Sequence, residues 1–566
     1  MKNILLTLCV GACLCGCENF LDTENYTQKN TGNFPLSADD ANAMLTGIYS
    51  IQNTYNTVVK NHPYLVSEAA SDERLGGCGE NSTDIQSLDK LVVPNLNNFE
   101  PIWINRYQGI YRANMLLETI DECKDFKTEE QKKQIKGEAY FLRALYYWEL
   151  VQLFETVPLV LKTEPENKPK ASVDEIYAQM GSDMVKAIEL MPSVTYDKTE
   201  SGRATKWAAE GYLSRIFLFY TGFYQKESMP LNDGKNLTKD KIAEYLDDCI
   251  QNSGHDLVSD FRNLWAYSNK HTAKHWQWAI DNNLNWEGDS NKEIMYAYKF
   301  AKIGVNGPTQ MYKNFFMLWQ GLPTKIKINK TFPYGHGWAL GSVCPHIWED
   351  WIEEEPDDIR RQGSIVDLDV EIPSYRTEGF DSWEETMYRA KKFMPVSAFD
   401  NKGNLKCSFT VLEWGVPNVF GQAYITDFPL LRFADILLMH SELTQTTNGI
   451  DRVRNRVGLS PIGTYSLEAL QNERRWELSF EGVRWNDIRR WHIAEQLLDK
   501  QVGVTVYNRG FETKMPALNG GYSARYRATN GGFWPIPQSQ IDLSNGVLVQ
   551  NKGWEEGDDF EYTGWH

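Results

Sequence analysis

The sequence predicts a mostly α-helical protein, built from pairs of helices, with a large irregular region that carries short strands. Apolar residues recur at intervals of three and four over Lys133–Phe154, which is the spacing of one buried helix face. Ser172 and Glu175 form a capping box that starts the next helix. Residues 256–425 lose this periodicity, are rich in Gly and Pro, and hold ten of the 19 Trp residues.

The first half of the chain predicts a run of helices. We expect them at residues 37–53, 103–120, 133–154, 172–191, 203–223 and 239–252. Pro158 and Pro192 stop two of them, since proline cannot continue a helix. Helix pairs of this length resemble tetratricopeptide repeats, although the strict repeat pattern is absent. Such a solenoid is a scaffold, and its function depends on what is attached to it.

Length and charge limit the classes of partner. A chain of 566 residues could form two to four domains. The formal charge of −18 argues against nucleic acid and against an anionic membrane surface as partners. Aromatic residues make up 13% of the chain, so we expect some of them in an exposed groove, with a heavy aromatic core as the alternative.

The N-terminus has the pattern of a bacterial lipoprotein signal. Lys2 precedes an apolar run over residues 4–14 that is too short to span a bilayer. The run ends in Leu14-Cys15-Gly16-Cys17, which resembles a lipobox. We therefore expect residues 1–16 to be removed, Cys17 to carry lipid, and residues 17–36 to act as a tether. An ordinary signal peptide with a chance cysteine is the alternative.

No motif for catalysis or metal binding stands out. The chain has no G-x-S-x-G, H-E-x-x-H, Walker A or dinucleotide-binding pattern. The carboxylate pairs Glu349/Asp350 and Glu353/Glu354 could serve a glycosidase, but a solvated face explains them in so acidic a chain. We expect no enzyme activity, no metal site and no cofactor. The remaining cysteines form no short C-x-x-C pair, so neither a zinc site nor a disulfide framework is indicated. A single disulfide between two of them is the alternative. They are Cys78, Cys123, Cys249, Cys344 and Cys407.

Charged and large apolar residues alternate closely over Leu470–Trp491. Helical spacing stacks Glu473 on Glu477, a like-charge pair that needs a nearby Arg, and brings Glu481 beside Arg484. Arg suits this setting because its planar fork pairs with carboxylates and packs on aromatic rings. We expect a half-buried ion network where several helices meet, and a structural role for it in place of a catalytic one.

Four segments carry a resemblance to a known family. They read ERRWELSFEGVRWNDIRRW at residues 473–491, GEAYFLRALYYWELVQLF at 137–154, LRFADILLMHSEL at 431–443 and FWPIPQSQIDLSNGVLVQNKGW at 533–554. Together with the lipobox, these motifs resemble the SusD/RagB family of lipid-anchored nutrient-binding proteins. The resemblance divides the mature chain into a helical region (37–255), a loop-rich ligand-binding insert (256–425) and a C-terminal region (426–566).

The resemblance also implies a place and partners. It predicts an outer-membrane lipoprotein, anchored through Cys17 and facing the cell exterior, that delivers an oligosaccharide to a SusC-like TonB-dependent transporter. A peptide ligand is the main alternative, because part of the family binds peptides. A surface glycosidase and a structural surface-layer component are further alternatives. Some relatives bind calcium, which the sequence does not decide.

The family's ligand site is implied to lie between the segment at residues 67–98, predicted here as a long irregular loop, and the loop-rich region. A sugar site needs flat aromatic platforms and planar polar partners for hydroxyls. No family motif fixes the ligand residues, so the candidates come from local context, and for each Trp a place in the core is the alternative. They are Asp72 and Arg74 as hydroxyl partners, Trp286, Trp319 and Trp338 as platforms beside Gly or Asn, and Tyr375 and Arg376 as lesser candidates.

Overall fold

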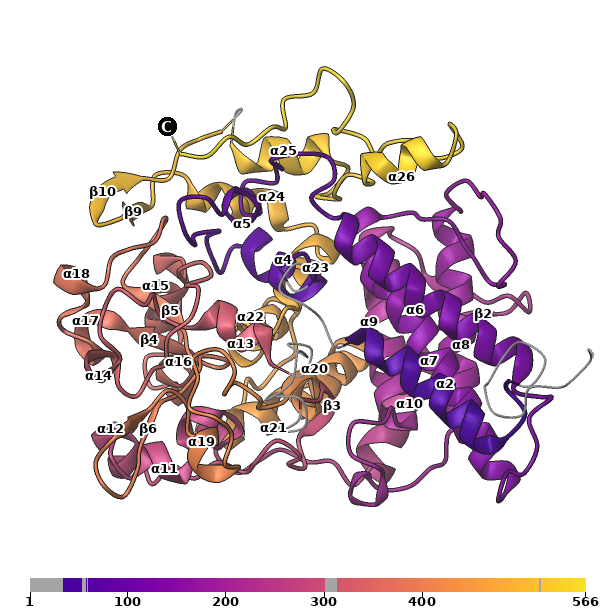
Figure 1. Cartoon of the computed structure of the whole chain (residues 1–566), viewed down its shortest axis with the longest axis horizontal. Coiled ribbons are helices and arrows are strands. Elements are labelled where there is room, and N and C mark those ends of the chain that lie inside the picture. Colours follow the sequence, from indigo (N-terminus) through magenta and orange to yellow (C-terminus); the bar gives the residue numbers. More distant parts are fainter. Residues whose placement is uncertain (1–33, 53–57, 59, 301–312, 519–520, 566) are drawn as a thin grey trace, which may run out of the picture.

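Long helices form the first half of the chain and pack against one another in sequence order (Figure 1). The structure is a computed structural model that describes residues 34–52, 58, 60–300, 313–518 and 521–565. The helices of this layer are α2 (Ala38–Tyr49), α6 (Glu100–Thr119), α7 (Glu129–Phe154), α8 (Val173–Leu190), α9 (Lys206–Phe223) and α10 (Lys239–Asn252). A ribbon of β1 (Ser228–Pro230) and β2 (Asn236–Thr238) joins α9 to α10. This layer confirms the mostly α-helical scaffold of helix pairs.

Local capping explains where these helices begin. The Ser172 side chain accepts a hydrogen bond from Glu175 N at 3.3 Å, and the Glu175 carboxylate accepts one from Ser172 N at 2.8 Å. The predicted capping box is therefore present, and it satisfies backbone donors that have no partner inside the helix. Thr128 caps α7 through its side chain alone, which accepts from Gln131 N. Thr238 caps α10 likewise, and the two ends of α10 are those predicted.

The middle of the chain consists of short elements joined by long connections. Its helices are α11 (Lys270–Ala273), α12 (Gln277–Asp281), α13 (Phe315–Gln320), α14 (Ile328–Thr331), α15 (Pro345–Glu354), α16 (Ile359–Ser364), α17 (Leu368–Glu371), α18 (Tyr375–Glu378) and α19 (Thr410–Glu413). Its strands are β3 (Ile294–Tyr298), β4 (Ile365–Asp367), β5 (Tyr388–Ala390), β6 (Ala398–Phe399) and β7 (Leu405–Lys406). The strands form two-stranded antiparallel ribbons, β4 with β5 and β6 with β7, while β3 pairs with β8 (Phe428–Arg432). The expectation of an irregular region with short strands is confirmed.

The C-terminal part returns to helices and then crosses the top of the molecule in Figure 1. Its elements are α20 (Phe433–Thr444), α21 (Asn448–Arg456), α22 (Leu467–Glu477), α23 (Arg484–Arg490), α24 (Ala494–Leu498), β9 (Thr505–Asn508), β10 (Phe511–Lys514), α25 (Tyr522–Ala528) and α26 (Gln538–Leu543).

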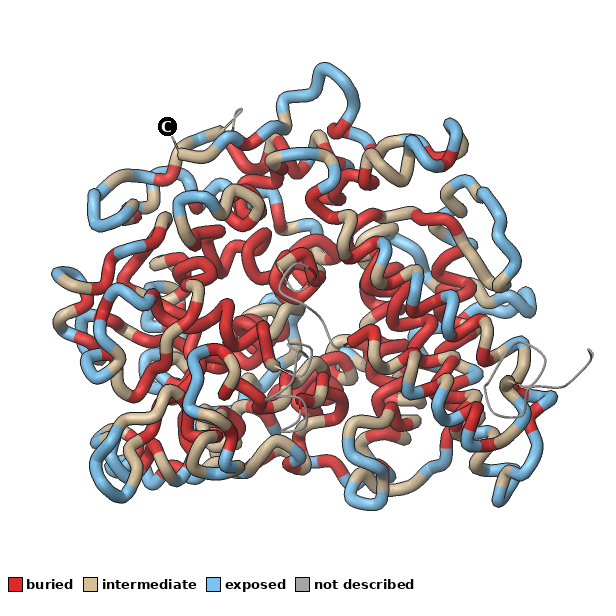
Figure 2. The backbone as a smooth tube through the Cα atoms, in the orientation of Figure 1, coloured by how far each residue is buried: buried red, intermediate tan, exposed pale blue. Residues whose placement is uncertain are grey.

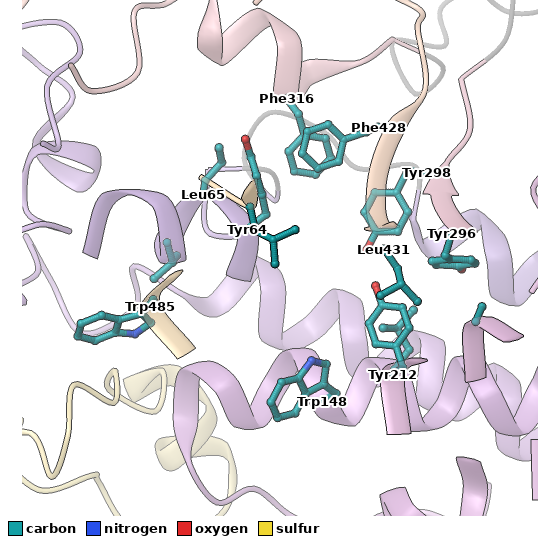
Figure 3. Close-up of a cluster of buried hydrophobic side chains, with 14 of the residues drawn as sticks. Tyr64, Leu65, Trp148, Tyr212, Tyr296, Tyr298, Phe316, Phe428, Leu431 and Trp485 are labelled. Atoms are coloured by element: carbon teal, nitrogen blue, oxygen red, sulfur yellow. The ribbon is translucent and has the colours of Figure 1, made fainter. Parts of the chain in front are cut away.

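One continuous core joins the helical layer to the irregular region. Buried backbone runs through both parts in Figure 2. The close-up in Figure 3 shows the junction, where side chains from helices α7 and α9 meet those from strands β3 and β8 and from α13. At its centre the rings of Phe316 and Phe428 stack with centroids 4.2 Å apart, and Tyr64 lies edge-on to both. The position of the irregular region is therefore fixed by its packing against the helices.

All five described cysteines are free thiols: Cys78, Cys123, Cys249, Cys344 and Cys407. Across the ranges that the structure describes, no helix has the length and apolar character needed to cross a membrane. The same ranges contain no group of three or more His, Cys, Asp or Glu side chains placed to hold a metal ion.

The stretch at residues 470–491 forms the predicted ion network. Glu477 pairs with Arg360 at 3.1 Å and with Arg432 at 3.0 Å, and it also pairs with Arg456. Arg360 also pairs with Glu473 at 2.5 Å, so it supplies the positive charge that the stacked Glu473 and Glu477 need. The network is more deeply buried than predicted, since Glu477 has no exposed surface.

The predicted pairing of Glu481 with Arg484 is wrong, because the helix does not continue through this stretch. Helix α22 ends at Glu477, and the backbone turns with φ of 62° at Phe480 and 73° at Gly482. A side chain at Gly482 would place its Cβ 2.5 Å from the Tyr64 ring, so only glycine fits there. Glu481 instead pairs with Arg432 and Lys392, both at 2.7 Å.

Replacing Glu477 with Gln should lower the free energy of unfolding by about 3–5 kcal/mol, because it leaves buried arginines without their counter-charge. Urea unfolding of the mature protein measures this. The control is Asp369→Asn, since Asp369 and its partner Arg376 are each 45% exposed and such a pair contributes under about 1 kcal/mol. A loss for E477Q no larger than for D369N would contradict a structural role for the network.

Candidate functional site

The segment at residues 67–98, predicted as a long irregular loop, is largely buried and begins and continues with helical turns. It begins in α4 (Pro63–Ala70), contains the single turn of α5 (Thr83–Gln86), and has no exposed residue between 71 and 78. Residues 79–84 return to the surface. Residues 94–97 also reach the surface, so these two short parts of the segment are the ones open to direct contact with a ligand.

Asp72 is not available as a hydroxyl partner, and that prediction is wrong. Its side chain has no exposed surface, and its two carboxylate oxygens accept hydrogen bonds from Arg484 Nε and Nη2, each at 2.8 Å. Burial alone would raise the pKa of Asp72, but the charge and hydrogen bonds of Arg484 outweigh burial and hold the pKa well below its usual range. Asp72 therefore joins this segment to α23.

Arg74 is likewise committed to the protein, so its predicted contact with ligand is also wrong. It is 1% exposed, and its guanidinium donates to Gln320 Oε1 at 2.7 Å and to the carbonyl oxygens of Leu340 and Gly341 at 2.8 and 2.7 Å. The two chain segments approach so closely that a Cβ at Gly341 would lie 1.6 Å from the Leu75 carbonyl oxygen. Arg74 thus holds together the segments that carry two of the predicted platforms.

Those platforms, Trp319 and Trp338, lie side by side. Their ring centroids are 4.8 Å apart, and the ring planes meet at 76°. Trp319 lies in the last turn of α13 and is 7% exposed, whereas Trp338 is half-buried. Backbone hydrogen bonds fix the pair, from Trp338 N to Leu318 O at 2.9 Å and from Leu340 N to Trp319 O at 2.7 Å.

The two rings line an open pocket of about 500 Å³, called here the Trp338 pocket. This volume lies within the range of small-molecule sites, about 300–1,000 Å³. Lys60 and Asp84 form a partly exposed ion pair at its rim. The other side chains that give it polar character are Asn81, Ser82, Thr324, Asp381 and Ser382. An indole face beside carboxylate, amide and hydroxyl groups can hold the apolar face of a sugar and its hydroxyls.

The pocket also contains a thiol, at Cys78. Burial raises the pKa of Cys78 to about 11, and its Sγ donates to the Trp338 carbonyl oxygen at 2.9 Å. At neutral pH the group stays protonated and is a poor nucleophile. Its hydrogen bond helps to hold the backbone of Trp338 in place.

Two family models match the chain. One, described as starch-binding and associating with the outer membrane, matches residues 19–218, and the SusD family model matches residues 421–554. The chain belongs to the SusD/RagB family. The first region contains α2, α6, α7, α8 and most of α9, and the second contains Arg432, Arg456 and Glu477 of the ion network.

Relatives of this SusD/RagB chain are distant in sequence and similar in fold. SusD-like protein P25 of Formosa agariphila is 23% identical over 539 residues, covering 87% of this chain and 90% of that protein. A SusD-like protein of Bacteroides ovatus is 21% identical over 426 residues, covering 71% of this chain and 67% of that protein.

Solved structures agree with the family assignment. A laminarin-binding SusD-like protein superposes with a TM-score of 0.68 at 23% identity, covering 92% of this chain and 100% of that chain. Surface glycan-binding protein A of Bacteroides thetaiotaomicron, in complex with laminarihexaose, gives a TM-score of 0.67 at 18% identity, covering 91% of this chain and 99% of that chain. At these identities the likeness establishes the fold.

Three further candidates do not line the Trp338 pocket of this SusD/RagB protein. Trp286 packs instead against Phe409, with centroids 5.4 Å apart, and against Trp414. Tyr375 has no exposed surface and donates to Glu385 Oε1 at 2.7 Å, so its predicted ligand contact is wrong. Arg376 is exposed, and its guanidinium makes two hydrogen bonds to Asp369, both at 2.7 Å.

Sequence reasoning missed most of the polar rim. The polar run from Asn81 to Asp84 is the sequence signal that could have selected this part of the rim. Lys60 and Asp381 lie far apart in the chain and in ordinary polar context, so local sequence gives no reason to select them.

A buried glutamate lies between the ion network and the pocket. Glu73 is 1% exposed, and its Oε2 accepts a hydrogen bond from Phe480 N at 3.2 Å, while Oε1 has no hydrogen-bond partner among the described residues. Burial raises the pKa of Glu73 to about 8, and nearby Asp72 and Glu68 add to the effect. Glu73 therefore carries a proton at neutral pH in the folded protein.

Stability should fall with rising pH because of Glu73. The folded protein keeps its proton up to about pH 8, whereas the unfolded chain releases it near pH 4.5. Between these values the unfolded state binds fewer protons, so the free energy of unfolding decreases as pH rises. Relative to Glu73→Gln, the wild-type protein should lose more than about 1 kcal/mol across this interval.

Denaturant unfolding of both proteins at a series of pH values tests this expectation. Glu80→Gln is the control, because Glu80 is an exposed carboxylate in the same segment, and its curve should run parallel to the wild-type curve. If E73Q also runs parallel to the wild type, Glu73 is not protonated in the folded protein.

Proposed function

We propose that this protein binds an oligosaccharide at the cell surface and delivers it to a SusC-like TonB-dependent outer-membrane transporter. The observation that carries the proposal is the Trp338 pocket, with its crossed indole rings and polar rim. Two structural relatives support the ligand class, since one is named for laminarin binding and the other was solved with laminarihexaose. Family membership supports the transporter as partner and the outer membrane as location.

Binding would use the half-buried ring of Trp338 as a platform for the apolar face of a sugar. Trp319 lies edge-on beside it and is almost completely buried, so it keeps the neighbouring ring from rotating. Arg74 holds the chain segments of both rings in place. Such preorganisation reduces the conformational entropy that the site loses when a ligand binds.

We propose capture without turnover. Glycoside cleavage needs two carboxyl groups on opposite sides of the scissile bond, one to donate a proton and one to act as a base or nucleophile. The described lining of the Trp338 pocket contributes Asp84 and Asp381, and Asp84 is held in an ion pair with Lys60. This arrangement favours binding hydroxyls over transferring protons.

Replacing Trp338 with Ala should raise the dissociation constant of the best glycan ligand at least tenfold, or about 1.4 kcal/mol, because the platform is lost. The experiment is a screen of residues 18–566 against plant, fungal and host glycans, followed by calorimetric titration of each hit. Trp348→Ala is the matched control, since Trp348 is a half-buried ring that stacks on Tyr388, 5.1 Å away, outside the pocket.

Equal losses for W338A and W348A would argue against the Trp338 pocket as the site. Binding of peptides without any glycan would overturn the proposed ligand class. Release of shortened glycan by the purified protein would overturn the proposal that no cleavage occurs.

Cys17 lies outside the described residues, and its lipidation remains a proposal. Cys17→Ser should abolish incorporation of labelled palmitate and release the protein from the outer-membrane fraction, because the fatty-acyl chains supply the membrane affinity. Metabolic labelling and fractionation of cells that produce each form measure both effects. Membrane retention of C17S without label would contradict anchoring through Cys17.

A further inference from the structure

A second pocket lies where the start of α9 meets β3, and it shares no lining residue with the Trp338 pocket. Its volume is about 370 Å³, within the range of small-ligand sites at about 300–1,000 Å³. It is called here the His255 pocket. Its walls come from residues 196–205, from His255, and from residues 289–299.

His255 gives this pocket an unmet hydrogen-bond acceptor. The side chain is 6% exposed, and its Nδ1 lies 2.8 Å from the Lys292 carbonyl oxygen. Burial lowers the pKa of His255 to about 4, so the ring is neutral at pH 7. A carbonyl oxygen can only accept, so Nδ1 carries the proton and Nε2 is a bare acceptor. Within the described chain Nε2 has no hydrogen-bond partner.

A buried acceptor without a partner destabilises the folded protein, so Nε2 favours any donor that can reach it. The ring is held in place by stacking on Tyr196, with centroids 4.7 Å apart and planes at 24°. Nε2 itself has almost no exposed surface, so a ligand hydroxyl reaches it when the neighbouring side chains of the pocket shift by a small amount.

Charges around the pocket limit what that donor can be. Arg203 is paired with Glu138 at 2.7 Å, and Lys299 is paired with Asp427. Asp197 and Glu200 are exposed and also line the pocket, so an anionic ligand would be repelled. Among the described residues, no three His, Cys, Asp or Glu side chains are placed to hold a metal ion together, which disfavours a cation as the ligand.

Hydroxyl and carboxyl groups supply the remaining polar lining. Ser201 and Ser290 face each other with their Oγ atoms 3.5 Å apart, and both are exposed. Burial and the neighbouring Asp427 raise the pKa of Asp289 well above its usual range, so its carboxyl group can donate as well as accept. These groups match a ligand that carries several hydroxyls.

We propose that the His255 pocket binds a neutral, hydroxyl-rich ligand of mono- to disaccharide size, with a ligand hydroxyl donating to His255 Nε2. The site is separate from the Trp338 pocket. Its occupancy does not depend on delivery to a transporter or on the glycan bound by Trp338.

Imidazole nitrogen resonances of histidine-labelled protein (residues 18–566) test the proposal on the wild-type chain. The probes are glucose, galactose, mannose, xylose and their common disaccharides, each titrated to about 50 mM, which covers the millimolar affinities of weak sites. The expected result is a neutral Nδ1–H tautomer for His255 and a saturable Nε2 shift toward the hydrogen-bonded value with at least one sugar. An Nε2 resonance that stays unchanged throughout all titrations would overturn the proposal.

A second measurement follows the sugar that shifts His255. Saturation transfer from protein to this sugar is compared in Trp338→Ala protein, which weakens binding at the other pocket, and in the W338A/H255F double variant. Phe at position 255 keeps the stacked ring and removes the acceptor, so the transferred signal should fall at least fivefold. W338A/H275F is the control, because His275 is exposed and does not line the His255 pocket. An undiminished signal in W338A/H255F would also overturn the proposal.

Discussion

Glu477 forms ion pairs with arginines of three different segments: Arg360 of α16, Arg432 of β8 and Arg456 of α21. All four side chains are buried, and a buried charge is tolerated only when it is paired and hydrogen-bonded. These charges can be buried only when three parts of the chain come together. The parts are the irregular region, the strand that joins it to the helices, and the C-terminal helices. This constraint sets the geometry on which the rest of the structure depends.

The same stretch is connected to the Trp338 pocket through one short turn. After α22 the backbone N–H groups of Phe480 and Gly482 donate to Glu73 and Glu68, and Arg484 binds Asp72. The segment held in this way continues into Arg74. This side chain donates hydrogen bonds to Gln320 and Leu340, which lie close in the chain to Trp319 and Trp338. The charged residues near the C-terminus thus act on the pocket as positioning groups, several contacts away from any ligand.

Local signals in the sequence predicted the helices well, because caps and apolar spacing depend on neighbours in the chain. The ion network was also predictable, since Glu473 and Glu477 on one helix face require a nearby cation, which proved to be Arg360. The site was only partly predictable. Asp72, Arg74 and Tyr375 are polar residues in an irregular context. Their burial depends on partners that lie ten residues away for Tyr375 and hundreds of residues away for Asp72 and Arg74. The glycines beside Trp319 and Trp338 indicate two rings that do lie together. Trp286 has a similar sequence context but packs in a different cluster.

A crystal structure of the protein with its tightest-binding oligosaccharide tests the central claim most directly. The account predicts density for a sugar ring stacked on the exposed face of Trp338, with ligand hydroxyls within hydrogen-bond distance of Asn81, Asp84 or Asp381. It also predicts that Asp72 and Arg74 keep their contacts to Arg484 and Gln320. Density bound at another surface, with the Trp338 pocket unchanged, would contradict the claim that this pocket is the ligand site.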